Sequence, residues 1–226
     1  ANWLHNGQGT GDTETGAYTL LGGTPTPSNG SSITRNFGAT WFLTSEDEWY
    51  KAAYYQPAAE GGDSDDYWLY PTASNSAPTV ATANSVGDIS NPGANVANRS
   101  FGADWNSQNG NVTTVGSAGP LSESFYGTSD QGGNVWEWNE SLESGLFRGL
   151  RGSSFNGLAD FLSASFPFSN NPTSLDFSVG FRVATVPEPS TLVLASCGLF
   201  SLIFAVKRRH RGRWSPKSPV GLLPTT

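Results

Sequence analysis

The clearest helical spacing of hydrophobic and polar positions lies between residues 45 and 54. Ser45 is followed three residues later by Glu48, a pattern typical of a capping box at the start of a helix. The hydrophobic residues that follow have i, i+3, i+4 spacing, which places them on one helix face. These residues are Trp49, Ala52 and Ala53. We therefore expect a helix from Ser45 to about Tyr54, with the acids of its first turn stabilising the helix dipole.

Most of the remaining chain is rich in small and polar residues, which favours loops. Residues 1–5 predict the end of a helix, and residues 7–40 predict loops with one short hairpin near residues 17–21. Residues 57–66 predict an acidic loop. Residues 72–120 are low in charge and contain no nucleotide-binding glycine pattern, histidine metal spacing or serine-nucleophile elbow. This composition indicates an irregular fold held by aromatic packing, in contrast to a helical bundle.

The pattern changes after Val186, where Pro187-Glu188-Pro189 precedes 17 uncharged residues, 190–206. A transmembrane helix needs about 17–25 apolar residues, so this segment is at the short end of the range for a membrane span. The basic cluster at residues 207–213 should stay on the cytoplasmic side, which places residues 1–186 outside the cytoplasm. The alternative is a buried core helix, and the basic cluster and the Pro-Glu-Pro boundary argue against it.

The charge of the chain differs between its two parts. Residues 1–186 contain 18 Asp and Glu against 6 Lys and Arg, whereas residues 187–226 contain 1 acid and 6 basic residues. The resulting balances of −12 and +5 account for the net charge of −7. Because nucleic-acid-binding proteins carry basic patches, the acidic body argues against nucleic acid as a partner. It fits a cation-binding or a soluble exported surface.

Residues 132–138, Gly-Gly-Asn-Val-Trp-Glu-Trp, carry the most informative chemistry. In an extended strand Trp136 and Trp138 share one face and Glu137 points to the other. With Asp130 just upstream, the segment offers two carboxylates and several carbonyls, which is what a hard cation such as calcium prefers. The alternative is an ordinary turn with core tryptophans and solvated acids.

Four segments resemble, in the same order, characteristic strings of the formylglycine-generating enzyme or sulfatase-modifying factor family. They are residues 42–53, 132–138, 151–155 and 180–184. The resemblance covers roughly residues 1–184. It implies a single-domain α+β fold, irregular and loop-rich, related to C-type-lectin-like folds, with two or more helices packed on short antiparallel strands. Because the chain contains no methionine, we expect that it begins inside this domain and that the family's N-terminal third lies upstream.

The family's enzymes oxidise a substrate cysteine through two cysteines that bind copper. Gly157 and Leu162 occupy the two corresponding positions, and the single cysteine, Cys197, lies in the apolar tail. Copper(I) selects thiolate ligands, which a glycine and a leucine cannot supply. Copper and oxidase activity of the family type are therefore not expected.

The resemblance also implies two calcium sites. The first set of ligands corresponds to Asp130, the carbonyls of Gly133 and Val135, and Glu137. A second, weaker set corresponds to Asn84, Ser85, Asn109 and Asn111, where amides replace a typical carboxylate. Calcium would pin irregular loops and so contribute to folding. Arg151 and Arg182 recur in the family strings, and we expect structural pairing in preference to substrate binding.

The tail resembles the bacterial PEP-CTERM sorting signal, with a linker at 185–189, a membrane span at 190–206 and a basic cytoplasmic tail at 207–226. It implies export, anchoring in the membrane and possible cleavage by an exosortase, although residues 214–226 extend beyond the usual end of such signals. We therefore expect a non-catalytic, calcium-stabilised surface module that binds a surface glycan or a matrix protein. The alternative is a family enzyme with altered oxidative chemistry, for which only two histidines, His5 and His210, are present.

Overall fold

The computed structural model describes residues 1–23 and 25–186. The predicted membrane span, the basic tail and most of the linker therefore lie outside the described residues. Within the described ranges, no helix has the length and apolar character needed to cross a membrane. Residues Ala1–Thr185 form one unit of contacting elements.

Regular helix is scarce in this unit. The α-helices of the described part are α1 (Asn2–His5) and α2 (Glu46–Tyr54), and the 3-10 helices are η1 (Ala58–Glu60), η2 (Pro120–Ser122) and η3 (Ala159–Leu162). The helix end predicted for residues 1–5 is confirmed as α1. Much of the chain between these elements consists of turns and loops, as the composition predicted.

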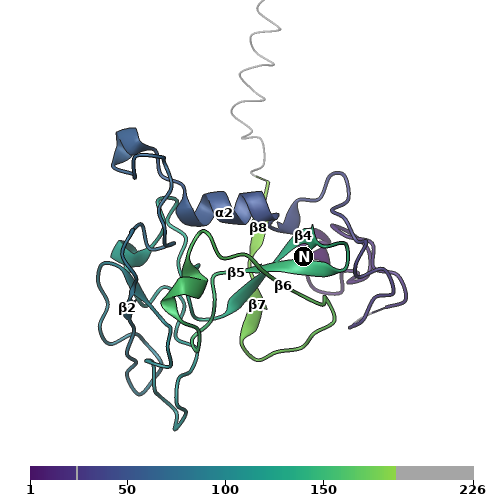
Figure 1. The fold of residues 1–226 in the computed structure, drawn as a ribbon. Coiled ribbons are helices and arrows are strands. Elements are labelled where there is room, and N and C mark those ends of the chain that lie inside the picture. Colours follow the sequence, from purple (N-terminus) through teal and green to yellow (C-terminus); the bar gives the residue numbers. More distant parts are fainter. Residues whose placement is uncertain (24, 187–226) are drawn as a thin grey trace, which may run out of the picture. The chain divides into compact units, whose positions relative to one another are not determined.

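Helix α2 follows the sequence prediction closely. The Ser45 hydroxyl accepts the backbone N–H of Glu48, and the Glu48 side chain accepts the backbone N–H of Ser45, so the capping box is complete. Trp49 and Ala53 are buried, whereas Ala52 is only half-buried. The buried face of α2 packs against the central strand β4 (Figure 1).

A four-stranded mixed sheet lies at the centre of the unit, in the order β6-β5-β4-β7 (Figure 1). Its strands are β4 (Trp136–Glu143), β5 (Phe147–Arg151), β6 (Phe168–Asn170) and β7 (Val179–Phe181). The β4–β5 and β5–β6 pairs are antiparallel, and the β4–β7 pair is parallel.

Two smaller pairs complete the strands of the described chain. Strand β1 (Trp41–Leu43) pairs antiparallel with β8 (Val183–Thr185), and β2 (Thr79–Val80) pairs parallel with β3 (Val96–Ala97). The expectation of antiparallel strands throughout is therefore wrong for two pairs. In both cases a long connection separates the partners in sequence, which allows the second strand to return in the same direction.

The hairpin expected near residues 17–21 does not form, because a side chain replaces the strand partner. The Asn2 amide donates to the carbonyl of Tyr18 at 3.1 Å and accepts its backbone N–H at 2.8 Å. The backbone polar groups of Tyr18 are therefore satisfied without a second strand.

Candidate functional site

The segment at residues 132–138 begins with a tight passage between two other stretches of chain. Gly133 has φ of +81°, and a Cβ atom there would lie 2.1 Å from the carbonyl oxygen of Asn98. Its N–H donates to the carbonyl of Gly152 at 2.7 Å, and the next N–H, of Asn134, donates to the Asn98 carbonyl at 2.8 Å. Only glycine combines this backbone conformation with so close an approach.

After this passage the chain enters β4, where the burial of alternate residues is the reverse of the usual hydrophobic pattern. Glu137 is buried, whereas Trp136 and Trp138 on the opposite face are half-buried. Trp136 packs against Phe168, with ring centroids 5.1 Å apart. The most buried side chain of these three is therefore that of Glu137, and neither tryptophan is a core residue.

Three hydrogen bonds satisfy the buried Glu137 carboxylate. The Trp49 indole N–H donates to Oε2 at 2.6 Å from helix α2. Arg182, between β7 and β8, donates from Nε to Oε2 at 2.5 Å and from Nη2 to Oε1 at 2.6 Å. This two-pronged ion pair and the indole connect α2, β4 and the C-terminal strands through one side chain.

A second buried ion pair lies on the neighbouring strand. Arg151 on β5 donates from Nε to Oε1 of Glu46 at 2.7 Å, and its Nη1 donates to the carbonyl of Ala164. The expectation that Arg151 and Arg182 make structural pairs is confirmed. Glu46, assigned from the sequence to the helix dipole, also takes part in this pair.

Asp130 lies close enough to the Glu137–Arg182 ion pair for both charges to affect its pKa. It has φ of +58° and is half-buried, and its Oδ2 accepts the N–H of Gly116 at 2.7 Å. Burial raises the pKa of Asp130 above its ordinary value, and the charges of Glu137 and Glu123 act in the same direction. The Gly116 hydrogen bond and the Arg182 charge oppose that rise. A cation beside Asp130 would therefore be favourable.

The proposed calcium ligands fit a hard cation in part. Asp130 provides a carboxylate without an ion pair, and among the described residues no turn or loop hydrogen bond ends on the carbonyl of Gly133 or Val135. Glu137 is already compensated by Arg182, which lowers the net negative charge that it can offer. Over the same part of the chain, no three His, Cys, Asp or Glu side chains are grouped closely enough to hold a metal. A cation would therefore depend on carbonyl oxygens as well.

The second set of predicted ligands is not brought together by hydrogen bonds. The Asn84 side chain accepts the N–H groups of Val86 and Asp88, which closes its own turn. In the part of the chain that the structure describes, Asn84 and Ser85 share no hydrogen bond with Asn109 or Asn111.

A buried cluster of amides that the sequence did not reveal lies beside the glycine passage. The Asn98 amide donates to the Asn111 carbonyl at 2.8 Å, to Asn134 Oδ1 at 3.2 Å and to Thr113 Oγ1 at 3.3 Å. Asn98 is 2% exposed, and its Oδ1 is buried with no hydrogen-bond partner. A single asparagine in a polar segment carries no local signal for such a position.

The two positions that the sequence resemblance aligned with the family's cysteines, Gly157 and Leu162, lie in packed surroundings. A Cβ atom at Gly157 would lie 2.0 Å from Oγ of Ser153, which is fully buried. Leu162 is also fully buried, in a hydrophobic cluster with Tyr70 and Ala97. The residues present therefore do not fit a copper site, because neither position supplies a thiolate.

Comparison with known proteins identifies the family. Residues 1–186 match the sulfatase-modifying factor enzyme 1-like domain. Among solved structures, Treponema denticola variable protein 1 is 21% identical with a TM-score of 0.45, covering 72% of this chain and 54% of that protein. CarF is 21% identical with a TM-score of 0.45, covering 69% of this chain and 52% of that protein.

The chain thus spans about half the length of these two proteins. No curated protein sequence matches it significantly. The family match extends over most of the 226 residues and ends where the mixed sheet and loops of the described unit end. The chain belongs to the sulfatase-modifying factor enzyme 1-like domain family.

Proposed function

We propose that this chain is a non-catalytic member of its family, a calcium-stabilised binding module displayed at the cell surface. The observation that carries the proposal is the packing at Gly157, where a Cβ atom would meet the buried Ser153 hydroxyl at 2.0 Å. Introducing a side chain into such a packed position costs roughly 1–3 kcal/mol. Residues 1–186 contain no cysteine, so the matched domain supplies no thiolate pair for oxidation of the family type, which supports the proposal.

Mass spectrometry of a cysteine-containing sulfatase peptide tests this proposal. The peptide is incubated with the complete exported domain and copper, and its mass should remain that of the unmodified peptide. An active formylglycine-generating enzyme, treated in parallel, controls for the quality of the peptide and the copper. A mass loss marking formylglycine in the sample with this domain would overturn the non-catalytic assignment.

Calcium is proposed as a stabilising ligand on two grounds. Asp130 is a half-buried carboxylate without an ion pair, and its raised pKa indicates that a cation is favourable beside it. Among the described residues, the buried Asn98 Oδ1 has no hydrogen-bond partner, and an amide oxygen is a ligand of the kind that calcium takes. Bound calcium would supply charge compensation and hold these loops in place.

Thermal unfolding with and without chelator tests the calcium proposal. Chelator should lower the melting temperature of the parent domain, and Glu137→Ala, or the milder Asp130→Asn, should remove that dependence. Glu143→Ala on the same strand is the matched control, since Glu143 is not among the proposed ligands, and it should keep the full calcium effect. Equal melting of the parent in both conditions would eliminate calcium from the function.

Surface anchoring is proposed from the sequence of residues 187–226. An uncharged segment of 17 residues followed by a basic cluster is the arrangement of a membrane anchor with a cytoplasmic tail. The Pro-Glu-Pro boundary supports a PEP-CTERM-type signal, with retention in the membrane or release to the matrix by an exosortase. Lys51, which is exposed, provides the test. It should react with an impermeant amine reagent in intact cells, and protection until lysis would contradict export.

A further inference from the structure

A cleft of about 500 Å³ opens beside the lost cysteine position and is lined by residues of three separate segments. Phe155 lies in its wall, buried, with the rings of Phe101 and Phe177 on either side at centroid distances of 6.4 and 6.1 Å. Phe101 is 45% exposed and Phe177 is 79% exposed. We call this feature the phenylalanine cleft. Its volume lies in the range of small-ligand sites.

The presentation of Phe101 requires an unfavourable backbone conformation. Ser100 and Phe101 have φ of +53° and +58°, a region that bulky residues rarely adopt. Their N–H groups donate to the carbonyls of Gly157 and Phe155 at 2.9 and 2.8 Å, which holds them there. Gly110 allows the facing loop to approach, since a Cβ atom would lie 2.9 Å from Cα of Phe101. Costly backbone conformations that expose an aromatic ring are concentrated at binding sites.

Four side-chain amides complete the cleft, and much of their hydrogen-bonding capacity is unused. They are Gln108, Asn109, Asn111 and Asn156. Within the described residues, the side chains of Gln108 and Asn109 make no hydrogen bond to the protein. Asn111 and Asn156 accept through Oδ1, from Val112 N and Ser154 Oγ, while no hydrogen bond is formed by their NH₂ groups. Each amide can donate and accept, as a hydroxyl can.

None of the residues lining the phenylalanine cleft is charged. A phosphate, sulfate or carboxylate ligand would need Arg or Lys, and a cation bound here would find no carboxylate to compensate its charge. Exposed rings with free amides instead match a ligand that has both apolar faces and many hydroxyls. We infer that the phenylalanine cleft binds an uncharged saccharide, whose C–H faces pack on the rings and whose hydroxyls bond the amides. This inference rests on the proposed function and names the site and ligand class of the binding module.

Affinity electrophoresis of the complete exported domain tests the inference. Native gels contain dextran, laminarin or galactomannan as neutral polymers, or alginate as an anionic polymer. At least one neutral polymer should retard the parent domain, and retardation should be insensitive to salt because no ion pair is involved. Phe177→Ala should weaken binding to that polymer by about fivefold, from the loss of one aromatic contact.

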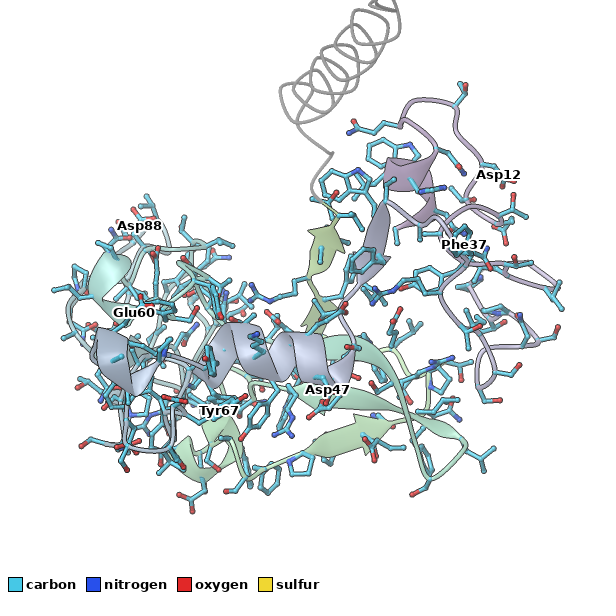
Figure 2. All side chains as sticks on the ribbon, turned by 90° about the horizontal axis from the view of Figure 1, so that it is seen from above. Asp12, Phe37, Asp47, Glu60, Tyr67 and Asp88 are labelled. Carbon is cyan, nitrogen blue, oxygen red and sulfur yellow. The ribbon has the colours of Figure 1, made fainter. Side chains whose placement is uncertain are left out.

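Phe37→Ala is the matched control, since Phe37 is fully exposed, is not part of the cleft and lies on the N-terminal segment (Figure 2). It should leave retardation unchanged. Gln108→Ala with Asn109→Ala should also weaken binding, without loss of folding, because both side chains are exposed and form no internal hydrogen bond. Circular dichroism of each variant verifies that it is folded.

The outcomes separate the cleft from the wider function. Retardation by a neutral polymer that survives both Phe177→Ala and the double amide substitution would overturn the cleft but leave a binding module. Salt-sensitive retardation by alginate alone would overturn the assignment of an uncharged ligand. Absence of retardation by every polymer would overturn the saccharide inference and remove glycan from the proposed function, leaving a protein ligand to be sought there.

Discussion

Replacement of Arg182 by methionine should destabilise the domain strongly, because it leaves the buried Glu137 carboxylate without its ion-pair partner. The Arg182 guanidinium donates from two nitrogens to the Glu137 carboxylate, at 2.5 and 2.6 Å. The Glu137 side chain is only 7% exposed, whereas that of Arg182 is 24% exposed. After Arg182→Met the carboxylate would keep the Trp49 indole as its hydrogen-bond donor and lose its compensating charge.

The expected magnitude follows from that asymmetry. Removing one partner of a buried ion pair costs about 3–5 kcal/mol, because the remaining charge is left uncompensated. Total stabilities of natural domains are about 5–15 kcal/mol, so a substantial part of the stability would be lost. The double variant Arg182→Met with Glu137→Gln removes the charge as well and should recover most of the loss. A neutral amide can still accept the Trp49 indole N–H.

Urea unfolding followed by tryptophan fluorescence, at pH 7 in chelator, measures these free energies. Lys51→Met is the control, because it removes an exposed cation. The Lys51 Nζ lies 5.1 Å from the centroid of the Tyr55 ring. Its cost should stay within about 1 kcal/mol. A loss below about 1 kcal/mol for Arg182→Met, or no recovery in the double variant, would refute the reasoning that Glu137 is held as a buried charge.

Three further substitutions test other parts of the structure. Ser45→Ala removes the capping hydroxyl of α2 and should cost about 1 kcal/mol in urea unfolding; no change would show that the capping box is dispensable. Gly133→Ala should prevent stable folding, seen as loss of the near-ultraviolet dichroism, because its Cβ would lie 2.1 Å from the Asn98 carbonyl at φ of +81°. The pKa of Asp130 in the folded domain is raised above its ordinary value of 3.8. The protonated carboxyl therefore contributes stability at pH values below 3.8, and this contribution is lost as the pH rises through the pKa of the folded state. Asp130→Asn should remove that loss and gain stability over the parent above this window in chelator; parallel pH profiles would contradict it.

The elements that the sequence predicted well are those whose interactions are local. Helix α2 and its capping box depend on residues three and four positions apart, and they formed as expected. The mixed order of the central sheet depends on the return of β7 beside β4 after a long connection. No short pattern encodes that return, which is why two parallel pairs were missed.

The burial of side chains in β4 also depends on partners far away in the sequence, which a local pattern does not encode. The alternation of Trp136, Glu137 and Trp138 correctly predicted two faces but not which one is buried. Glu137 is buried because Arg182, 45 positions away, supplies the compensating charge. The burial of Asn98 depends equally on distant residues, since its NH₂ group donates to oxygens of Asn111 and Asn134.

Gly157 connects a position that the sequence aligned with a family cysteine to the phenylalanine cleft. The Oγ of Ser153 lies beside Gly157, and Leu162 belongs to the buried cluster with Tyr70 and Ala97. The Gly157 carbonyl also accepts the N–H of Ser100, and this hydrogen bond helps to hold Phe101 in its unfavourable conformation. Residues in such conformations cluster at binding sites, which supports the ligand site that we propose for this uncharged, amide-lined cleft. The Gly157 carbonyl thus supports the phenylalanine cleft that we propose as a saccharide site.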